Sequence, residues 1–165
     1  MAPINANVDP IPTDRRYFED YQGGSVFECG SIVVEESEII AFARRYDPQD
    51  FHTDPDAAAR SVYCGLIASG WHSCAIAMEL AVGSMLKDSE SFGSPGIEEL
   101  QWLEPVRPGD ALRLRAEVLE SRRSASGRTG SVRARWELWN QNDVKVLSLI
   151  GTTLFDTAAP DPRDH

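Results

Sequence analysis

The first half of the chain combines one strand-like run with two stretches of helical periodicity. Residues 25–34 are apolar and strand-like. In residues 37–46, Ser37 is placed to cap a helix. Four residues recur there on one helix face: Ile39, Ile40, Ala43 and Tyr46. Pro48 disfavours helical geometry at Asp47, so we expect the first helix to end there.

A longer helix is predicted over residues 70–87. Its larger apolar side chains recur at every third or fourth position: Trp71, Ala75, Met78, Val82 and Met85. Such a helix would be about 27 Å long. Because it carries so much apolar surface, we expect other elements to surround it. Between the two helices, residues 47–63 are expected to be irregular, with one helical turn at 54–60.

The rest of the chain is predicted as β-structure. Four strand-length segments are separated by turn residues: 97–103, 111–121, 130–140 and 144–154. We expect them to follow one another as a meander of antiparallel strands. Such a sheet needs one apolar face covered, and the long helix is the element able to cover it. The pattern therefore predicts an α+β fold in which an antiparallel sheet wraps around a long central helix.

Size and composition indicate one domain. With 165 residues the chain has room for a single compact core, expected over residues 17–156. Residues 1–16 and 157–165 are rich in Pro, Asp and small residues and are expected to be flexible. The sequence shows no signal-peptide pattern and no membrane-spanning apolar run. The three cysteines form no CxxC pair, which argues against disulfides or zinc and favours the cytoplasm.

The charge distribution argues against nucleic acid as a partner. The formal net charge is −10, which repels a phosphate backbone. Basic residues nevertheless gather in the C-terminal half: Arg113, Arg115, Arg122, Arg123, Arg128, Arg133 and Arg135. We expect most of them to lie on solvated strand faces. Contact between one or two of them and a phosphorylated ligand such as CoA is the alternative.

Asp47 and His52 are the strongest candidates for chemistry. They lie five positions apart in a segment that Pro48 keeps from continuing as a helix. A carboxylate and an imidazole brought together there could hold one water, take its proton and return a proton to a substrate. The alternative is that Asp47 caps the helix and His52 stabilises a turn. His72 lies inside the long helix and is expected to be packed.

Two glycines mark the entry to the long helix. Gly70 stands at its expected start, and Gly65 lies in the preceding loop. A glycine at a helix N-terminus leaves backbone N–H groups free and allows close approach of a ligand, whose carbonyl oxygen the positive helix end would stabilise. The alternative is close packing of the helix against the sheet, and the residues alone leave both open. The acidic run Asp50, Asp54 and Asp56 lacks the glycine and glutamate of a calcium loop, so no metal site is expected.

From about Tyr17 to Phe155 the chain resembles the MaoC-like dehydratase and (R)-specific enoyl-CoA hydratase family. Three segments carry the resemblance: YDPQDFH at 46–52, GLIASGWH at 65–72 and LQWLEPVRPGD at 100–110. It implies the hot-dog fold, a catalytic dyad of Asp47 and His52, and a backbone N–H at Gly70 that binds a thioester oxygen. It also implies a homodimer with the site near the subunit interface.

The chain departs from the family pattern at three positions. Gln49 stands where the signature has Asn, and Asp50 where it has Pro. Met78 replaces a hydroxyl residue found in the central helix of some active members. These changes leave the dyad intact and weaken any transfer of substrate specificity.

The resemblance implies a hydro-lyase that adds water to an enoyl-CoA or removes it from a 3-hydroxyacyl-CoA. Gln49, Gly65, Ser69 and Trp71 complete the expected substrate-binding set, with core packing as the main role of Trp71. No metal or redox cofactor is expected, because the CoA belongs to the substrate. The alternatives are a hot-dog acyl-CoA thioesterase and a non-catalytic acyl-CoA-binding subunit.

Overall fold

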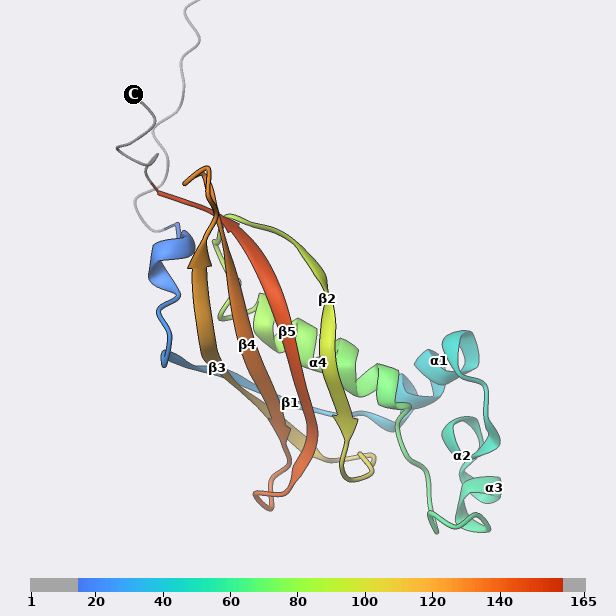
Figure 1. The fold of residues 1–165 in the computed structure, drawn as a ribbon. Coiled ribbons are helices and arrows are strands. Elements are labelled where there is room, and N and C mark those ends of the chain that lie inside the picture. Colours follow the sequence, from blue (N-terminus) through green and yellow to red (C-terminus); the bar gives the residue numbers. More distant parts are fainter. Residues whose placement is uncertain (1–14, 159–165) are drawn as a thin grey trace, which may run out of the picture.

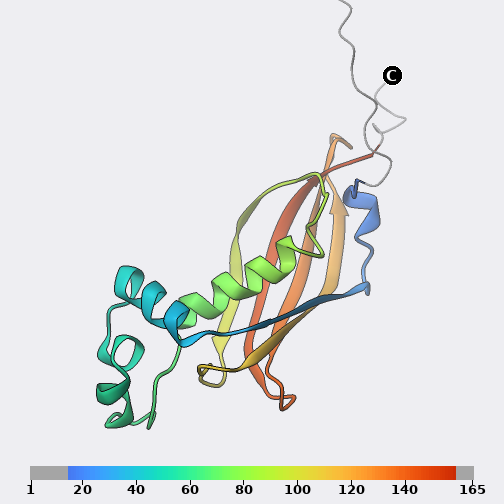
Figure 2. The same ribbon diagram turned by 180° about the vertical axis from the view of Figure 1, so that it is seen from behind.

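A five-stranded antiparallel sheet curls around one long helix in the computed structural model, which describes residues 15–158. Figures 1 and 2 show α4 lying along the concave side of the sheet, with three short helices gathered at its N-terminal end. The elements are η1 (Phe18–Asp20), β1 (Val26–Val33), α1 (Glu36–Tyr46), α2 (Asp50–Thr53), α3 (Pro55–Ala59), α4 (Gly70–Val82), β2 (Ser91–Trp102), β3 (Ala111–Arg123), β4 (Thr129–Trp139) and β5 (Lys145–Asp156). This is the predicted α+β hot-dog fold.

The strand order corrects one prediction. The sheet runs β1-β3-β4-β5-β2, and each neighbouring pair is antiparallel. The last three strands form a meander as expected. The expected four-strand meander is wrong for β2, which pairs with β5 at the far edge of the sheet. Because β1 already occupies the open side of β3, β2 has no place beside the strand that follows it in the chain.

The alternation of side chains along β3 and β4 separates an apolar face from a charged one. Every second residue is buried against the helix side: Leu112, Leu114, Ala116, Val118, Val132, Ala134, Trp136 and Leu138. The residues between them carry the arginines. Arg115 lies opposite Glu137 and Glu117 opposite Arg135, and unlike charges facing each other across strands stabilise the pairing. Arg133 also pairs with Glu98 at 2.8 Å. These arginines therefore lie on a strand face, as predicted.

The first helix also follows the sequence with small differences. It begins at Glu36 after an N-cap at Glu35, so Ser37 lies inside the first turn and is not the cap. It ends at Tyr46, immediately before Asp47, as Pro48 predicts. The predicted turn at 54–60 appears as α3, and α2 is an additional short helix within the segment expected to be irregular.

The central helix starts at Gly70 as predicted but ends at Val82, five residues early. Gly83 follows as the C-cap, and glycine is among the poorest residues for continuing a helix. The chain then turns and folds Met85 fully into the core, where the Tyr21 hydroxyl donates to the Met85 carbonyl oxygen at 2.7 Å.

The face of α4 that packs on the sheet is not the face that the spacing predicted. Its buried apolar residues are Ile76, Ala77, Leu80 and Ala81. The predicted core positions Trp71, Ala75, Met78 and Val82 are exposed, and core packing for Trp71 is wrong, since its side chain is 57% exposed. A helix that is apolar nearly all round offers two faces, and one sheet covers only one of them.

The expected flexible tails lie mostly outside the described residues. Of the parts that are described, Arg16 donates from its guanidinium to the carbonyl oxygens of Ser84 and Met85, and the Thr157 hydroxyl donates to the Gly127 carbonyl. Within residues 15–158, none of the helices has the length and apolar character required to cross a membrane. The cytoplasmic location stays a prediction.

Candidate active site beside the start of the central helix

Local geometry brings Asp47 and His52 together. Asp47 is the C-cap of α1, and a tight turn in which the Gln49 N–H donates to the Asp47 carbonyl leads directly into α2. His52 lies in α2, with its Nε2 atom 3.4 Å from Oδ2 of Asp47. The interruption at Pro48 therefore places both side chains on the same side of the turn.

Two hydrogen bonds hold the Asp47 carboxylate. The Ser69 hydroxyl donates to Oδ2 at 2.7 Å, and the Gln49 amide donates to Oδ1 at 2.7 Å. These two bonds, with a smaller contribution from His52, hold the pKa of Asp47 below its ordinary value despite the opposing effect of burial. Asp47 is therefore ionised at neutral pH. Gln49 stands where the family signature has Asn, and both residues carry a side-chain amide. In this chain that amide donates to the carboxylate of Asp47.

His52 is oriented by a backbone carbonyl. Its ring is buried, and Nδ1 lies 2.8 Å from the Ile67 carbonyl oxygen. Because a carbonyl oxygen only accepts, Nδ1 carries a proton, and in the neutral form of the ring the lone pair of Nε2 points toward Asp47. Nε2 and the Asp47 carboxylate are then two neighbouring acceptors. One water molecule can donate to both, and this arrangement suits proton abstraction from that water.

Gly70 serves both interpretations raised by the sequence. It is the first residue of α4, where backbone N–H groups lack partners within the helix, and no described residue accepts from its N–H. A Cβ atom at this position would also lie 2.4 Å from Cε2 of Trp102, so close packing requires glycine as well. Gly65 lies in the preceding loop, close to Arg107. Its φ of +153° is a backbone conformation that residues with a side chain rarely adopt, and this favours glycine at the position.

His52 and Gly70 line one pocket of about 410 Å³, called the dyad pocket below, whereas Asp47, Gly65 and Ser69 are not part of its lining. Its lining comes from residues 49–68, the start of α4, the end of β2 with the loop that follows it, and the start of β5: Gln49, Phe51, His52, Tyr63, Ile67, Ala68, Gly70, Ser73, Trp102, Leu103, Glu104, Pro105, Val106 and Val146. Trp71 is not part of this lining. The imidazole of His52 and a free helix-end N–H therefore line the same space, with the Asp47 carboxylate next to the imidazole. In the described part of the chain, no cluster of three His, Cys, Asp or Glu side chains is arranged to hold a metal ion.

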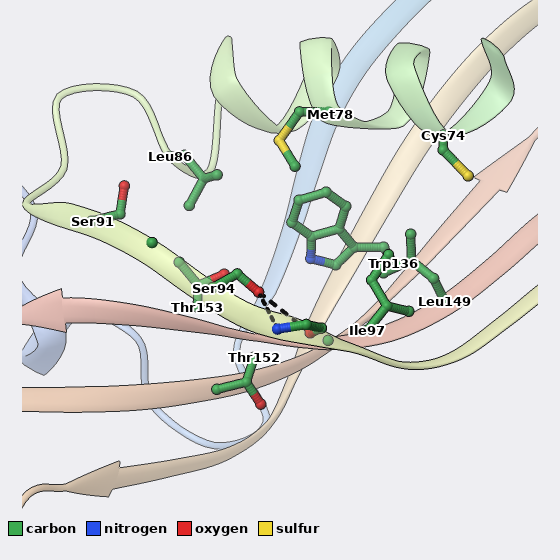
Figure 3. Close-up of a pocket in the computed structure, with 13 residues that line it drawn as sticks. Cys74, Met78, Leu86, Ser91, Ser94, Ile97, Trp136, Leu149, Thr152 and Thr153 are labelled. Atoms are coloured by element: carbon green, nitrogen blue, oxygen red, sulfur yellow. Dashed lines mark hydrogen bonds between the residues drawn. The ribbon is translucent and has the colours of Figure 1, made fainter. Parts of the chain in front are cut away.

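A second pocket of about 340 Å³ lies between α4, β2 and β5. Figure 3 shows Met78 and Cys74 pointing from α4 toward Trp136, with Leu149 and Ile97 beside them. Met78 therefore lines this apolar pocket and not the one that contains His52. The family departure at Met78 changes the second pocket and leaves the surroundings of the dyad unchanged.

Sequence reasoning missed two roles. Ser69 was expected only as part of the substrate-binding set, yet its hydroxyl bonds directly to Asp47 across 22 positions of sequence. Trp102 was not a candidate, although it lines the dyad pocket and contacts Gly70. The only sequence signal for these roles was position: Ser69 lies in the motif segment 65–72, and Trp102 lies in the motif segment 100–110.

We expect Ser69→Ala to raise the pKa of Asp47 toward its ordinary value, because the hydrogen bond from the Ser69 hydroxyl to the Asp47 carboxylate is lost. The same change removes the helix cap, since Ser69 Oγ accepts from the Trp71 N–H at 3.3 Å. The free energy of unfolding should fall by about 1 kcal/mol. Carbon-detected NMR titration of Asp47 and urea unfolding measure the two effects. Ser69→Thr, which keeps a hydroxyl, is the control, and an unchanged Asp47 titration would show that the bond has no influence.

His72 is packed, as predicted. Its ring stacks on Phe42 with centroids 4.7 Å apart and planes 12° from parallel. It is 8% exposed, and its Nδ1 atom finds no hydrogen-bond partner among the described residues. Burial lowers the pKa of His72, and the charges of Glu38 and Glu79 oppose this only in part. The folded protein therefore keeps this imidazole neutral.

Stability should consequently depend on pH through His72. A folded-state pKa below the unfolded value of 6.5 means that unfolding takes up a proton as the pH falls below about 6.5. We expect stability to be constant above that pH and to drop below it, by at most about 1.4 kcal/mol per pH unit. In His72→Phe, which keeps the ring stack, urea unfolding should show a smaller loss between pH 7 and pH 5.5. Equal losses in both proteins would assign the effect to other groups.

Comparison with known proteins identifies the family of the chain. The MaoC-like dehydratase from Rhodospirillum rubrum superposes with a TM-score of 0.82 at 34% identity, covering 87% of this chain and 99% of that one. Mesaconyl-CoA hydratase of Cereibacter sphaeroides is 31% identical over 89% of this chain, which spans only 44% of that protein. The uncharacterized protein YdeM of Bacillus subtilis is 28% identical, and the match covers 78% of this chain and 91% of YdeM. The family model of the MaoC like domain matches residues 21–140, and the chain therefore belongs to the MaoC-like family.

Proposed function

We propose that the protein is a hydratase that adds water across the C2=C3 bond of an enoyl-CoA, or removes it from a 3-hydroxyacyl-CoA in the reverse direction. The observation that carries the proposal is one pocket lined by His52 and by Gly70, whose N–H has no partner among the described residues, with the Asp47 carboxylate 3.4 Å from Nε2 of His52. Membership of the MaoC-like family supports a hydratase or dehydratase role. The named hydratase relative supports a CoA thioester as substrate.

The proposed reaction begins with a water held between Nε2 of His52 and Oδ2 of Asp47. His52 takes a proton while the water oxygen bonds to C3, and the electrons of the double bond move onto the thioester oxygen. The Gly70 N–H and the positive end of α4 stabilise that oxygen. His52, now charged and facing Asp47, then returns the proton to C2. Hydroxyl and hydrogen are thus added without any change in oxidation state, so the proposal needs no metal or redox cofactor.

The direct test is incubation of the purified protein with crotonyl-CoA. We expect loss of the ultraviolet absorbance of the enoyl thioester and formation of 3-hydroxybutyryl-CoA, identified by mass. Parallel incubation with butyryl-CoA and a thiol reagent detects free CoA. Release of CoA from the saturated thioester without hydration of the enoyl thioester would favour a thioesterase. Calorimetric binding of both thioesters without turnover would favour a binding subunit. Either result would overturn the hydratase proposal.

We also propose that a second copy of the chain covers the exposed side of α4 and β2. Large apolar side chains are exposed there: Trp71, Met78, Val82, Phe92, Ile97 and Trp102. The strand β2 ends the sheet, so its outer edge lacks a partner strand within the described residues. A long free edge beside exposed apolar groups is a template for pairing with another chain. A homodimer would protect both.

A further inference from the structure

Trp102 makes an unusual contact with the first residue of the central helix. It is the last residue of β2, and its indole Nε1–H donates to the Gly70 carbonyl oxygen at 2.9 Å across 32 positions of sequence. A carbonyl in the first turn of a helix already accepts a bond from the residue four positions on. Trp102 therefore adds a second donor to the Gly70 carbonyl and ties the helix start to the sheet edge.

The same ring restricts the position of Gly70 by direct contact. A Cβ on Gly70 would lie 2.4 Å from Cε2 and 2.6 Å from Nε1 of Trp102, so the indole rests against the glycine Cα. On the other side, Ser69 caps the helix by accepting from the Trp71 N–H. The Trp71 ring completes the contact edge-on to Trp102, with centroids 5.4 Å apart. The backbone around Gly70 is thus held from two directions.

This contact lies at the pocket of the dyad. Trp102 lines that pocket together with His52 and Gly70. A backbone donor lowers a reaction barrier only if it already points at the place where negative charge develops. The Gly70 N–H belongs to the peptide unit that joins Ser69 to Gly70, and the carbonyl bound by Trp102 belongs to the next unit, so Trp102 acts on the direction of the N–H by holding the Cα that joins the two units and the carbonyl beyond it.

We infer that Trp102 is a positioning residue, which fixes the Gly70 N–H as the donor to the thioester oxygen through its bond to the Gly70 carbonyl. This inference rests on the proposed hydratase function. Trp102 itself touches no reacting atom in this scheme. Its effect is expected on the turnover step, because the oxygen needs the donor most when it carries charge.

The test is Trp102→Phe, which keeps an aromatic ring near Gly70 and removes the N–H donor. We expect kcat for crotonyl-CoA hydration to fall about tenfold, with KM changed much less. The matched control is Trp139→Phe, on the outer face of β4, which should keep the native kcat. A residue that only packs would lower the melting temperature and leave kcat per folded molecule unchanged, and that result would overturn the inference. A rise in KM alone would overturn it too, because it would assign Trp102 to ground-state binding of substrate.

An NMR measurement separates this inference from the proposed function. The Gly70 amide resonance should shift when butyryl-CoA binds to the native protein, and this shift should be lost or altered in Trp102→Phe. If the native protein binds butyryl-CoA but hydrates no enoyl-CoA, the hydratase proposal fails while the positioning by Trp102 is still tested. If the phenylalanine variant is unstable, β-(3-benzothienyl)alanine at position 102 keeps the ring shape and lacks the donor. An unchanged Gly70 shift in that protein would overturn the inference.

Discussion

Asp47→Asn is expected to lower the rate of enoyl-CoA hydration by about 10²–10⁴-fold. The asparagine retains the size of the side chain and an oxygen that can accept from Ser69. It loses the negative charge that faces Nε2 of His52 at 3.4 Å and would stabilise the imidazolium formed during proton transfer. The measurement is kcat/KM for crotonyl-CoA, with the melting temperature recorded for each protein.

His52→Gln is expected to cost a similar factor, because the group that takes and returns the proton is gone. The double variant should be only slightly slower than either single variant, since residues that act as a unit give non-additive losses. Asp56→Asn is the matched control, because Asp56 is an exposed carboxylate in α3, the helix that follows α2. Full activity in both single variants would place the chemistry outside this pocket.

Ile97→Asp and Val82→Asp are each expected to dissociate the proposed dimer into monomers. Ile97 is exposed on β2 and Val82 is exposed on α4. A carboxylate placed in an apolar interface without a partner costs several kcal/mol, which raises the dissociation constant by at least about 100-fold. Light scattering after gel filtration should give twice the chain mass of 18.2 kDa for the native protein and the single mass for the variants.

Val144→Asp controls for the added charge. Val144 is exposed next to the turn that joins β4 and β5 and is not one of the α4 and β2 residues of the proposed interface. It should remain dimeric. A native protein that is monomeric at micromolar concentration, or two variants that stay dimeric, would rule out this surface as the dimer interface.

The local part of the site could be predicted from the sequence. Pro48 ends α1 at Asp47 through a steric effect between adjacent residues, and His52 follows within one turn of chain. The prediction that the arginines of β3 and β4 lie on solvated strand faces likewise held for those that alternate with the buried residues, because side chains in a strand point to opposite faces in turn. These features depend on neighbours a few positions away.

The tertiary structure decided what depends on distant segments. The bond from Ser69 to Asp47 and the bond from Trp102 to Gly70 join residues that only the packing of α4 against α1 and β2 brings together. The tertiary structure also decided which face of α4 is buried. Because apolar residues surround this helix, periodicity could not predict that Ile76 is buried and Trp71 exposed. The place of β2 was settled by β1 pairing with β3. The sequence determined most secondary-structure elements and the pairing of Asp47 with His52, because these follow from local sterics and from the alternation of side chains. The residues that contact this pair were decided by the tertiary structure, because they depend on which surfaces remain free when the sheet closes around the helix.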